Sequence, residues 1–254
     1  MNDLVTLELI VKAPEGVKLP QSAGSVLHGM LMEHIDKDYV ESLHQQALRP
    51  YSQHLKFDKE RDALVWRISA LNKRAADEVL APAFALPMCV HLKQKGWDLQ
   101  ILGKNYVSNT SYEKLAEKYF AHEIDVSAIE YRFLTSCSFK TDGDYAIFPQ
   151  PKLITKSLVN RWNAFATAER LDERSVAYDL AEQVYVADYD LKMQKFALEG
   201  TRIQAFRGSY TLAFKGNLMS RKIMCMIGEF AQYSGIGIKT ALGMGATKTN
   251  LIKW

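Results

Sequence analysis

A strand–helix–strand–strand–helix–strand order that occurs twice along the chain is the feature that most restricts the fold. Residues 4–12 open the first copy and alternate in polarity, with Val5, Leu7, Leu9 and Val11 on one side. Alternation with a period of two indicates a strand, whereas apolar residues three and four apart indicate a helix. The order of the two patterns is that of a ferredoxin-like unit. The sequence therefore predicts an α+β protein with two such β-α-β-β-α-β units in tandem.

The first predicted unit covers residues 1–125. Ser22 or Gly24 is expected to cap a helix whose apolar positions continue to Ile35, and the polar residues 36–50 predict an irregular segment. The other predicted elements are strands at 51–57 and 64–71, a short helix at 73–80 stopped by Pro82, and a bent strand or hairpin at 89–102.

The second predicted unit covers residues 126–254. Its predicted elements are strands at 128–140, 184–196, 203–214 and 246–253, with helices at 153–168 and 218–233. No linker or low-complexity segment separates the two units, so the pattern alone places the boundary. A shared hydrophobic core in a chain of 254 residues suffices for independent folding.

Composition excludes several classes of protein. Hydrophobic residues make up 48% of the chain and charged residues 24%, which excludes wholesale disorder. No apolar run approaches the length of about 18 residues that a membrane span needs, and the start lacks the pattern of a leader peptide. The three cysteines are far apart, as expected for a protein of the reducing cytoplasm.

Charge is distributed unevenly between the halves of the chain. The net charge of +3 gives by itself no reason to expect a polyanionic partner. Divided at residue 125, however, the N-terminal half carries a net −2 and the C-terminal half a net +5. This asymmetry suggests that the C-terminal half faces an anion, although a few surface charges alone would give the same count.

A glycine-rich segment, GIGIKTALGMG, occupies residues 235–245. Glycines permit positive φ and close approach of backbone N–H groups to a ligand, and with Lys239 and Thr240 the segment can cradle a phosphate. Its spacing matches neither the P-loop nor the dinucleotide-binding pattern. A plain glycine-rich turn is the alternative interpretation of this segment.

Three blocks of sequence carry a resemblance to a known family. They are GSVLHGMLM at 24–32 with Leu43-His44 downstream, FPQPK at 148–152 running on to WNAF at 162–165, and the glycine-rich segment. On these blocks the chain resembles the CRISPR-associated endoribonucleases that process repeat RNA, within the RAMP superfamily of RNA-recognition-like folds. The blocks span nearly the whole chain.

The resemblance implies cleavage of precursor CRISPR RNA within the repeat, without a metal or other cofactor. The 2′-hydroxyl attacks the adjacent phosphate and leaves 2′,3′-cyclic phosphate and 5′-hydroxyl ends. Repeat RNA is the implied partner, with a transient contact to an effector complex and a homodimer as further options. One alternative is a non-catalytic RNA-binding subunit of a CRISPR effector. Another is a ferredoxin-like metabolic enzyme, for which the sequence lacks a nucleotide motif.

The resemblance assigns the catalytic residues. His44 is the first choice, His28 a second acid–base or orienting group, and Tyr39 a donor to the phosphate or nucleophile. Histidine suits these roles because its ordinary pKa is about 6.5. His34 falls on the apolar stripe and is expected in the core, and the other three histidines, His54, His91 and His122, are expected to be structural.

The same resemblance assigns RNA-binding residues to the second unit. Lys152 and Lys156 share a helical face by their spacing, and Arg161 follows; all three are expected to contact phosphates, with a merely solvated face as the alternative. The remaining candidates lie in the glycine-rich segment and are Gly235, Gly237, Lys239, Gly243 and Gly245. Lys239 is expected to hold RNA backbone, or to stabilise the transition state if it reaches the scissile phosphate.

Overall fold

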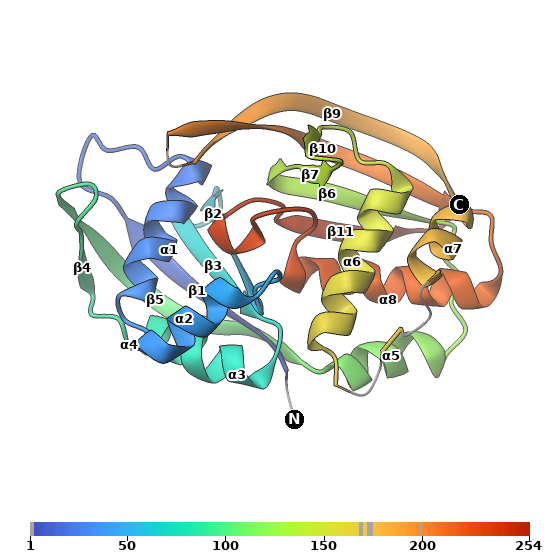
Figure 1. Ribbon diagram of the computed structural model, residues 1–254, viewed down its shortest axis with the longest axis horizontal. Helices are drawn as coiled ribbons and strands as arrows, with labels where there is room; N and C mark the ends of the chain where they lie inside the picture. The colour runs from blue at the N-terminus through green and yellow to red at the C-terminus, as the bar shows by residue number, and fades with distance from the viewer. Residues whose placement is uncertain (1–2, 168–169, 172–174, 199) are drawn as a thin grey trace. The chain divides into compact units, whose positions relative to one another are not determined.

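The computed structural model describes residues 3–167, 170–171, 175–198 and 200–254 (Figure 1). The chain forms two compact units, Met1–Thr110 with Lys239–Gly243, and Ser111–Ile238 with Met244–Trp254. The division therefore differs from the expected boundary at residue 125. Helix α5 (Tyr112–Phe120) belongs to the second unit, and the middle of the glycine-rich segment belongs to the first.

An antiparallel five-stranded sheet forms the first unit, in the order β2-β3-β1-β5-β4. Four of its strands have the ferredoxin-like arrangement, and β4 is added at one edge. The sequence-based strands are confirmed, and the segment around Gly96 is a hairpin. The strands are β1 (Leu4–Lys12), β2 (Tyr51–Asp58), β3 (Ala63–Ala70), β4 (Cys89–Leu92) and β5 (Trp97–Thr110).

Helices cover one face of this sheet (Figure 1). The first, α1 (Gly24–Met32), follows the 3-10 turn η1 (Gln21–Ala23). Its N-cap is Ala23, without a side-chain hydrogen bond, so the expected cap at Ser22 or Gly24 is wrong. The polar segment expected to be irregular contains a second helix, α2 (Lys37–Gln45). The side chain of Asp36 accepts hydrogen bonds from the first-turn N–H groups of α2, which begins the helix.

The helix expected to stop before Pro82 instead continues past it. It consists of α3 (Lys73–Ala75), the π-helical turn η2 (Ala76–Leu80) and α4 (Ala81–Ala85). Proline lacks an N–H group, but Pro82 stands in the first turn of α4, where a missing donor is tolerated. The buried side chains of these helices pack with β1, β3 and β5 in one hydrophobic core.

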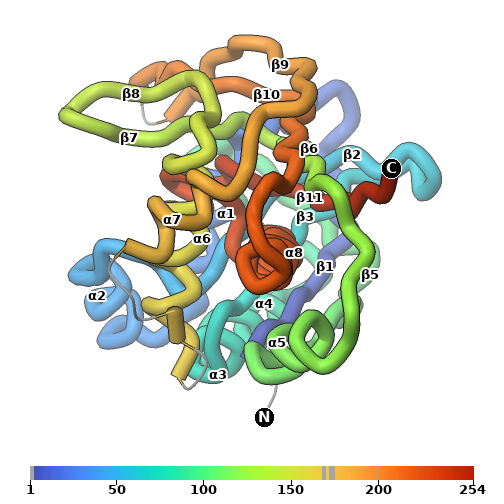
Figure 2. The backbone as a smooth tube through the Cα atoms, turned by 90° about the vertical axis from the view of Figure 1, so that its right-hand side faces the viewer, coloured from blue at the N-terminus to red at the C-terminus, as the bar shows by residue number. Residues whose placement is uncertain are grey.

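The second unit contains a four-stranded antiparallel sheet in the order β11-β6-β10-β9, which is again ferredoxin-like. A separate hairpin of two short strands projects outward (Figure 2). The strands are β6 (Ala128–Cys137), β9 (Val184–Leu198), β10 (Thr201–Phe214) and β11 (Thr247–Ile252), and the hairpin consists of β7 (Phe139–Thr141) and β8 (Asp144–Ala146).

The described part of this unit also contains the helices α6 (Pro151–Phe165), α7 (Val176–Glu182) and α8 (Leu218–Ser234). The expected helix at 153–168 thus corresponds to α6, and Ala168 lies outside the described residues. Asn217 caps α8 by accepting a hydrogen bond from Ser220 N–H. Edge-to-face contacts among Tyr112, Trp162 and Phe230 join α5, α6 and α8.

Among the described helices, none has the length and apolar character that crossing a membrane requires.

Candidate active site

His28 and Tyr51 form the centre of the candidate site in the first unit. The hydroxyl of Tyr51 on β2 lies 2.9 Å from Nδ1 of His28 on α1. The two rings are nearly parallel, at an interplanar angle of 16° and a centroid distance of 6.2 Å. Tyr51 is fully buried and His28 is half-buried, so one edge of the imidazole is fixed by the core.

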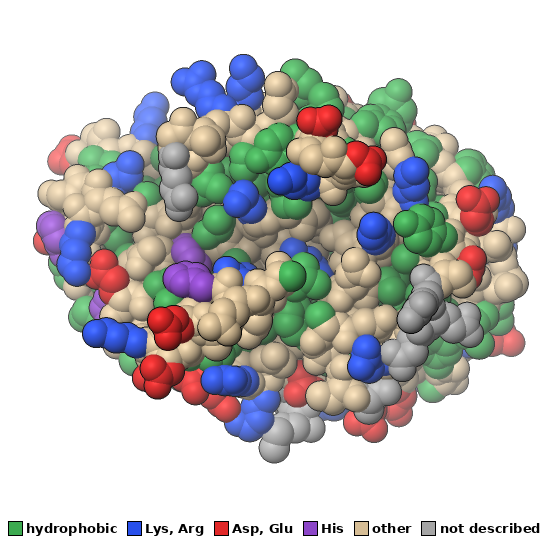
Figure 3. All heavy atoms as spheres, in the orientation of Figure 1, with side chains coloured by type: hydrophobic (Ala, Val, Ile, Leu, Met, Phe, Trp, Pro, Cys, Tyr) green, Lys and Arg blue, Asp and Glu red, His purple; other side chains and the backbone are tan. Residues whose placement is uncertain are grey.

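His44 and Arg49 lie close enough to His28 to act electrostatically on its imidazole ring. His44 lies in the last turn of α2 and is exposed, and Arg49 follows in the segment before β2, where it donates to the carbonyl of Gln46. Burial, followed by the positive charges of Arg49 and His44, lowers the pKa of His28 to about 4. Histidine side chains reach the molecular surface beside lysine and arginine side chains in Figure 3. The structure thus brings the two predicted histidines together.

Tyr39, the third predicted catalytic residue, is buried, whereas His44 is exposed. The side chain is 2% exposed, and the guanidinium of Arg74 covers its ring at 4.8 Å. Burial raises the pKa of Tyr39 to about 12, and its hydroxyl acts electrostatically on that of Tyr51. The tyrosine is therefore part of the support of the site, and its burial disfavours the direct contact with phosphate that the sequence suggested.

Gln53 provides a second connection between β2 and α1. Its amide nitrogen donates to the carbonyls of Gly24, at 2.6 Å, and Ala241, at 3.0 Å. Its carbonyl oxygen accepts from Nε1 of Trp66 at 2.6 Å. Gly24 and His28 are one helical turn apart, and Tyr51 and Gln53 point to the same face of β2. The two bonded pairs therefore fix α1 against β2.

Backbone N–H groups of the glycine-rich segment donate hydrogen bonds to residues outside the segment. In the second unit, Gly237 N–H donates to Ser157 Oγ, Ile238 N–H to the Ser138 carbonyl, and Gly245 N–H to the Ser136 carbonyl. These N–H groups are already used inside the protein. All four predicted glycines have positive φ, and they are Gly235, Gly237, Gly243 and Gly245.

Lys239 is the exposed, charged member of this segment. It has the left-handed conformation, with φ of 53°, and precedes the short turn η3 (Thr240–Leu242), which packs in the first unit. Its ammonium group is therefore presented to solvent at the start of a turn that is fixed to α1 through Gln53.

The three basic residues of α6 fall into two groups. Lys152 and Lys156 are exposed, in accord with their predicted shared face. Arg161 is 4% exposed, and its Nη2 donates to the Gly237 carbonyl at 3.0 Å. The expectation of a surface phosphate contact for Arg161 is therefore wrong, because an apolar side of the helix buries this residue. Burial lowers the pKa of Arg161 to about 10.

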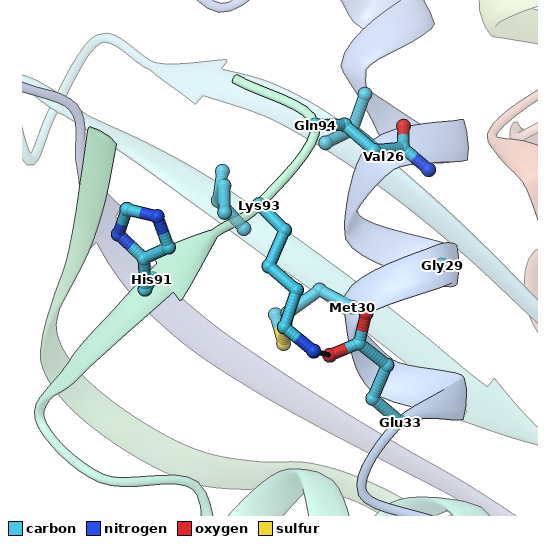
Figure 4. Close-up of a pocket in the computed structure, with 8 residues that line it drawn as sticks. Val26, Gly29, Met30, Glu33, His91, Lys93 and Gln94 are labelled. Carbon is cyan, nitrogen blue, oxygen red and sulfur yellow. Dashed lines mark hydrogen bonds and ion pairs between the residues drawn. The ribbon is translucent and has the colours of Figure 1, made fainter. Parts of the chain in front are cut away.

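The other histidines divide between core and surface. His34, expected in the core, is exposed at the end of α1, where its Nδ1 lies 3.0 Å from the Met30 carbonyl. His54 is buried, as expected for a structural residue. Nδ1 of His91 lies 2.6 Å from Oδ1 of Asp98. His91 also lines a pocket beside α1 (Figure 4), together with Val26, Gly29, Met30, Glu33, Leu92, Lys93 and Gln94.

Sequence reasoning missed Tyr51, Arg49 and Gln53 as members of the site. The strand pattern indicated that Tyr51 and Gln53 share a face, but no local signal paired them with α1. Among the described residues, no group of three or more His, Cys, Asp or Glu side chains is placed to hold a metal ion.

Fold and site together define the class: a tandem ferredoxin-like protein with a pair of histidines on its first unit. Residues 131–247 match the family model described as CRISPR-associated endoribonuclease Cas6. Two relatives with that name come from Mycobacterium tuberculosis and Streptococcus thermophilus. The first is 30% identical over 96% of this chain and 77% of its own length, and the second 32% identical over 87% and 88%.

Solved Cas6 structures share the fold. A Cas6 product complex is similar with a TM-score of 0.79 and 21% identity, covering 97% of this chain and 99% of its own. A Cas6 of Thermus thermophilus gives a TM-score of 0.75 at 19% identity, over 98% and 99%. The chain therefore belongs to the Cas6 family of CRISPR-associated endoribonucleases, which are RNA-cleaving enzymes of CRISPR RNA processing.

Proposed function

We propose that this protein cuts precursor CRISPR RNA within the repeat by metal-independent transesterification. A base removes the proton from the 2′-hydroxyl, and the 2′-oxygen forms a bond to the adjacent phosphorus. The bond from phosphorus to the 5′-oxygen breaks, and an acid protonates that oxygen. The products are a 2′,3′-cyclic phosphate and a 5′-hydroxyl.

The convergence of His28, His44 and Arg49 is the observation that carries the proposal. Two imidazoles supply the proton-transfer and donor groups, and a guanidinium stabilises the charge that develops on the phosphorane. The exposed position of His44 and the half-burial of His28 leave both rings accessible to RNA. Tyr39 supports Tyr51 from below in this proposal rather than touching RNA.

Lys152 and Lys156 are proposed to hold the RNA backbone on α6, with Lys239 as a further phosphate contact. Ammonium groups on an exposed helical face neutralise phosphates without reading sequence. The similar Cas6 structure solved as a product complex supports RNA as the partner. The buried Arg161 and the glycines act through the shape of the glycine-rich segment.

The decisive experiment mixes purified protein with labelled repeat RNA in excess EDTA. Cleavage is expected to persist in EDTA and to stop when the nucleotide 5′ of the scissile phosphate carries a 2′-deoxy substitution. Polynucleotide kinase should label the new 5′-hydroxyl directly. Cleavage that needs a divalent cation, or that continues on the deoxy substrate, would overturn the mechanism. Tight binding without any cleavage would favour the non-catalytic subunit.

A further inference from the structure

We propose that Tyr51 is a positioning residue that donates its hydroxyl hydrogen to Nδ1 of His28 and fixes the ring as the Nε2–H tautomer. His28 then donates a hydrogen bond from Nε2 to the scissile phosphate, and proton transfer falls to His44. This division of roles rests on the proposed function, whereas the tautomer of His28 does not.

The geometry supports a fixed rather than a transient bond. Tyr51 is fully buried, its ring is stacked parallel to the imidazole, and its hydroxyl oxygen is 2.9 Å from Nδ1. Backbone pairing of Tyr51 with Ala70 holds β2 at this position. A hydroxyl held in this way presents one hydrogen-bond geometry to His28. In acid–base sites, a hydrogen bond from a second group to one ring nitrogen orients the imidazole in the same manner.

The direction of the bond follows from the other partner of the hydroxyl. Among the residues that the structure describes, the other hydrogen-bond partner of the hydroxyl is Met32 Sδ, at 4.0 Å. Thioether sulfur is a weak acceptor. If Tyr51 accepted from an Nδ1–H, its own hydrogen would have only that sulfur. Donation to Nδ1 therefore satisfies both groups, and the ring hydrogen is left on Nε2.

The charges around His28 favour its neutral form. His44 from α2 and Arg49 from the segment before β2 both place positive charge near it, and burial acts in the same direction, so its pKa falls to about 4. A ring that is neutral near pH 7 has one N–H to offer and is a poor proton donor in the sense of general acid catalysis. A neutral imidazole that polarises an oxygen through its N–H is an established catalytic arrangement.

Nuclear magnetic resonance of the free, histidine-labelled protein tests the tautomer without any RNA. The ring ¹⁵N and ¹³Cδ2 shifts of His28, assigned by its substitution, are expected to report Nε2–H at pH 7 in the wild type. In Tyr51→Phe they are expected to move toward a mixture of tautomers. An Nδ1–H ring in the wild type, or shifts unchanged by Tyr51→Phe, would overturn the inference even if the protein cuts RNA.

Single-turnover cleavage tests the consequence for catalysis. Tyr51→Phe keeps the ring and is expected to lower the cleavage rate about tenfold to a hundredfold with RNA affinity unchanged, since one oriented hydrogen bond is lost. Tyr131→Phe is the matched control, because Tyr131 is also fully buried and its hydroxyl has no partner among the described atoms. Equal rates for Tyr51→Phe and Tyr131→Phe would refute the positioning role while leaving the proposed function intact.

Substitution of His28 separates donation from proton transfer. The side-chain amide of His28→Gln offers an N–H at a similar reach, so this variant is expected to retain a rate at least tenfold above that of His28→Ala. A residue that must gain and lose a proton would be equally impaired by both changes, and that result would overturn the assigned role. If the wild type cleaves no repeat RNA, the proposed function fails, and the resonance measurement still decides the tautomer.

Discussion

Arg161 on α6 donates a hydrogen bond of 3.0 Å from Nη2 to the carbonyl oxygen of Gly237. One helical turn earlier, Ser157 Oγ accepts from the N–H of the same glycine at 2.9 Å. Gly237 has a φ of 84°, and a Cβ there would collide with the Ser138 carbonyl. The helix thus holds both polar groups of a residue that only glycine can occupy without strain.

Arg161→Ala is expected to destabilise the protein by about 2–4 kcal/mol, because it leaves a cavity at a buried side chain and removes the hydrogen bond to the part-buried Gly237 carbonyl. Denaturant unfolding measures this change. Lys156→Ala, on the exposed face of the same helix, is the control and should alter the free energy of unfolding by less than about 0.5 kcal/mol. Comparable stability of the two variants would show that the Arg161 contact contributes little.

Lys152→Ala and Lys156→Ala are each expected to weaken RNA binding and to reduce the slope of log K against log salt by about one, because each removes one phosphate contact. Binding titrations from low to moderate salt measure the slope. Lys73, paired with the exposed Asp77 in the first unit, provides a control substitution to Ala. A slope that is the same in all four proteins would exclude α6 from the RNA interface.

His44→Ala is expected to lower the cleavage rate by about two to four orders of magnitude while RNA affinity persists, because proton transfer loses its group. Single-turnover kinetics with saturating enzyme measures the rate apart from binding. His34→Ala serves as the control, since His34 is also exposed and its Nδ1 lies 3.0 Å from the Met30 carbonyl of α1. A His44→Ala rate close to that of His34→Ala would remove His44 from the reaction.

Gly24→Ala and Gly29→Ala should have opposite effects on stability. A Cβ on Gly24 would lie 2.9 Å from the Leu242 carbonyl oxygen and 3.1 Å from Gly243 Cα, whereas on Gly29 it would meet only the flexible side chain of Gln94 at 3.4 Å. We expect Gly24→Ala to cost about 1–3 kcal/mol and Gly29→Ala to gain up to about 1 kcal/mol. Thermal unfolding compares them, and the reverse order would contradict the packing of η3 on α1.

Acid should destabilise the protein through two histidines. Burial is the main cause that lowers the pKa of His28 to about 4 and that of His54 to about 3, from about 6.5. Below pH 6.5 the unfolded chain binds protons that the folded chain does not bind until pH 4 to 3. The free energy of unfolding should therefore fall on acidification, by about 1.4 kcal/mol per pH unit for each histidine.

Urea unfolding between pH 7 and pH 5 measures this slope. His54→Gln removes one of the two titrating histidines. The part of the slope of unfolding free energy against pH that the two histidines cause should therefore fall by about half, whatever the effect of the substitution on stability at pH 7. His34→Gln, at an exposed position, should leave it unchanged. A slope that His54→Gln does not alter would mean that His54 titrates alike in both states.

The two ferredoxin-like units and most of their strands and helices could be predicted from hydrophobic periodicity. Hydrophobic periodicity is a local property that burial on one face imposes directly, so β1, β10 and α8 were predictable within a few residues. The helix α2 was also within reach, because Asp36 is a helix-capping residue and Tyr39 and Leu43 are four apart. Its high proportion of polar side chains concealed that signal.

Which polar groups contact one another depends on long-range packing and was not predictable from local patterns. Lys152 and Arg161 are both cations on α6, but helical phase against the core exposes one and buries the other. His28 and Tyr51 are 23 residues apart, and their bond exists because α1 packs across β2. No sequence period encodes such a pairing. The sequence thus pointed to His28 and His44 as candidate catalytic residues. Long-range packing made His28 the one whose pKa burial lowers and whose Nδ1 lies beside the Tyr51 hydroxyl.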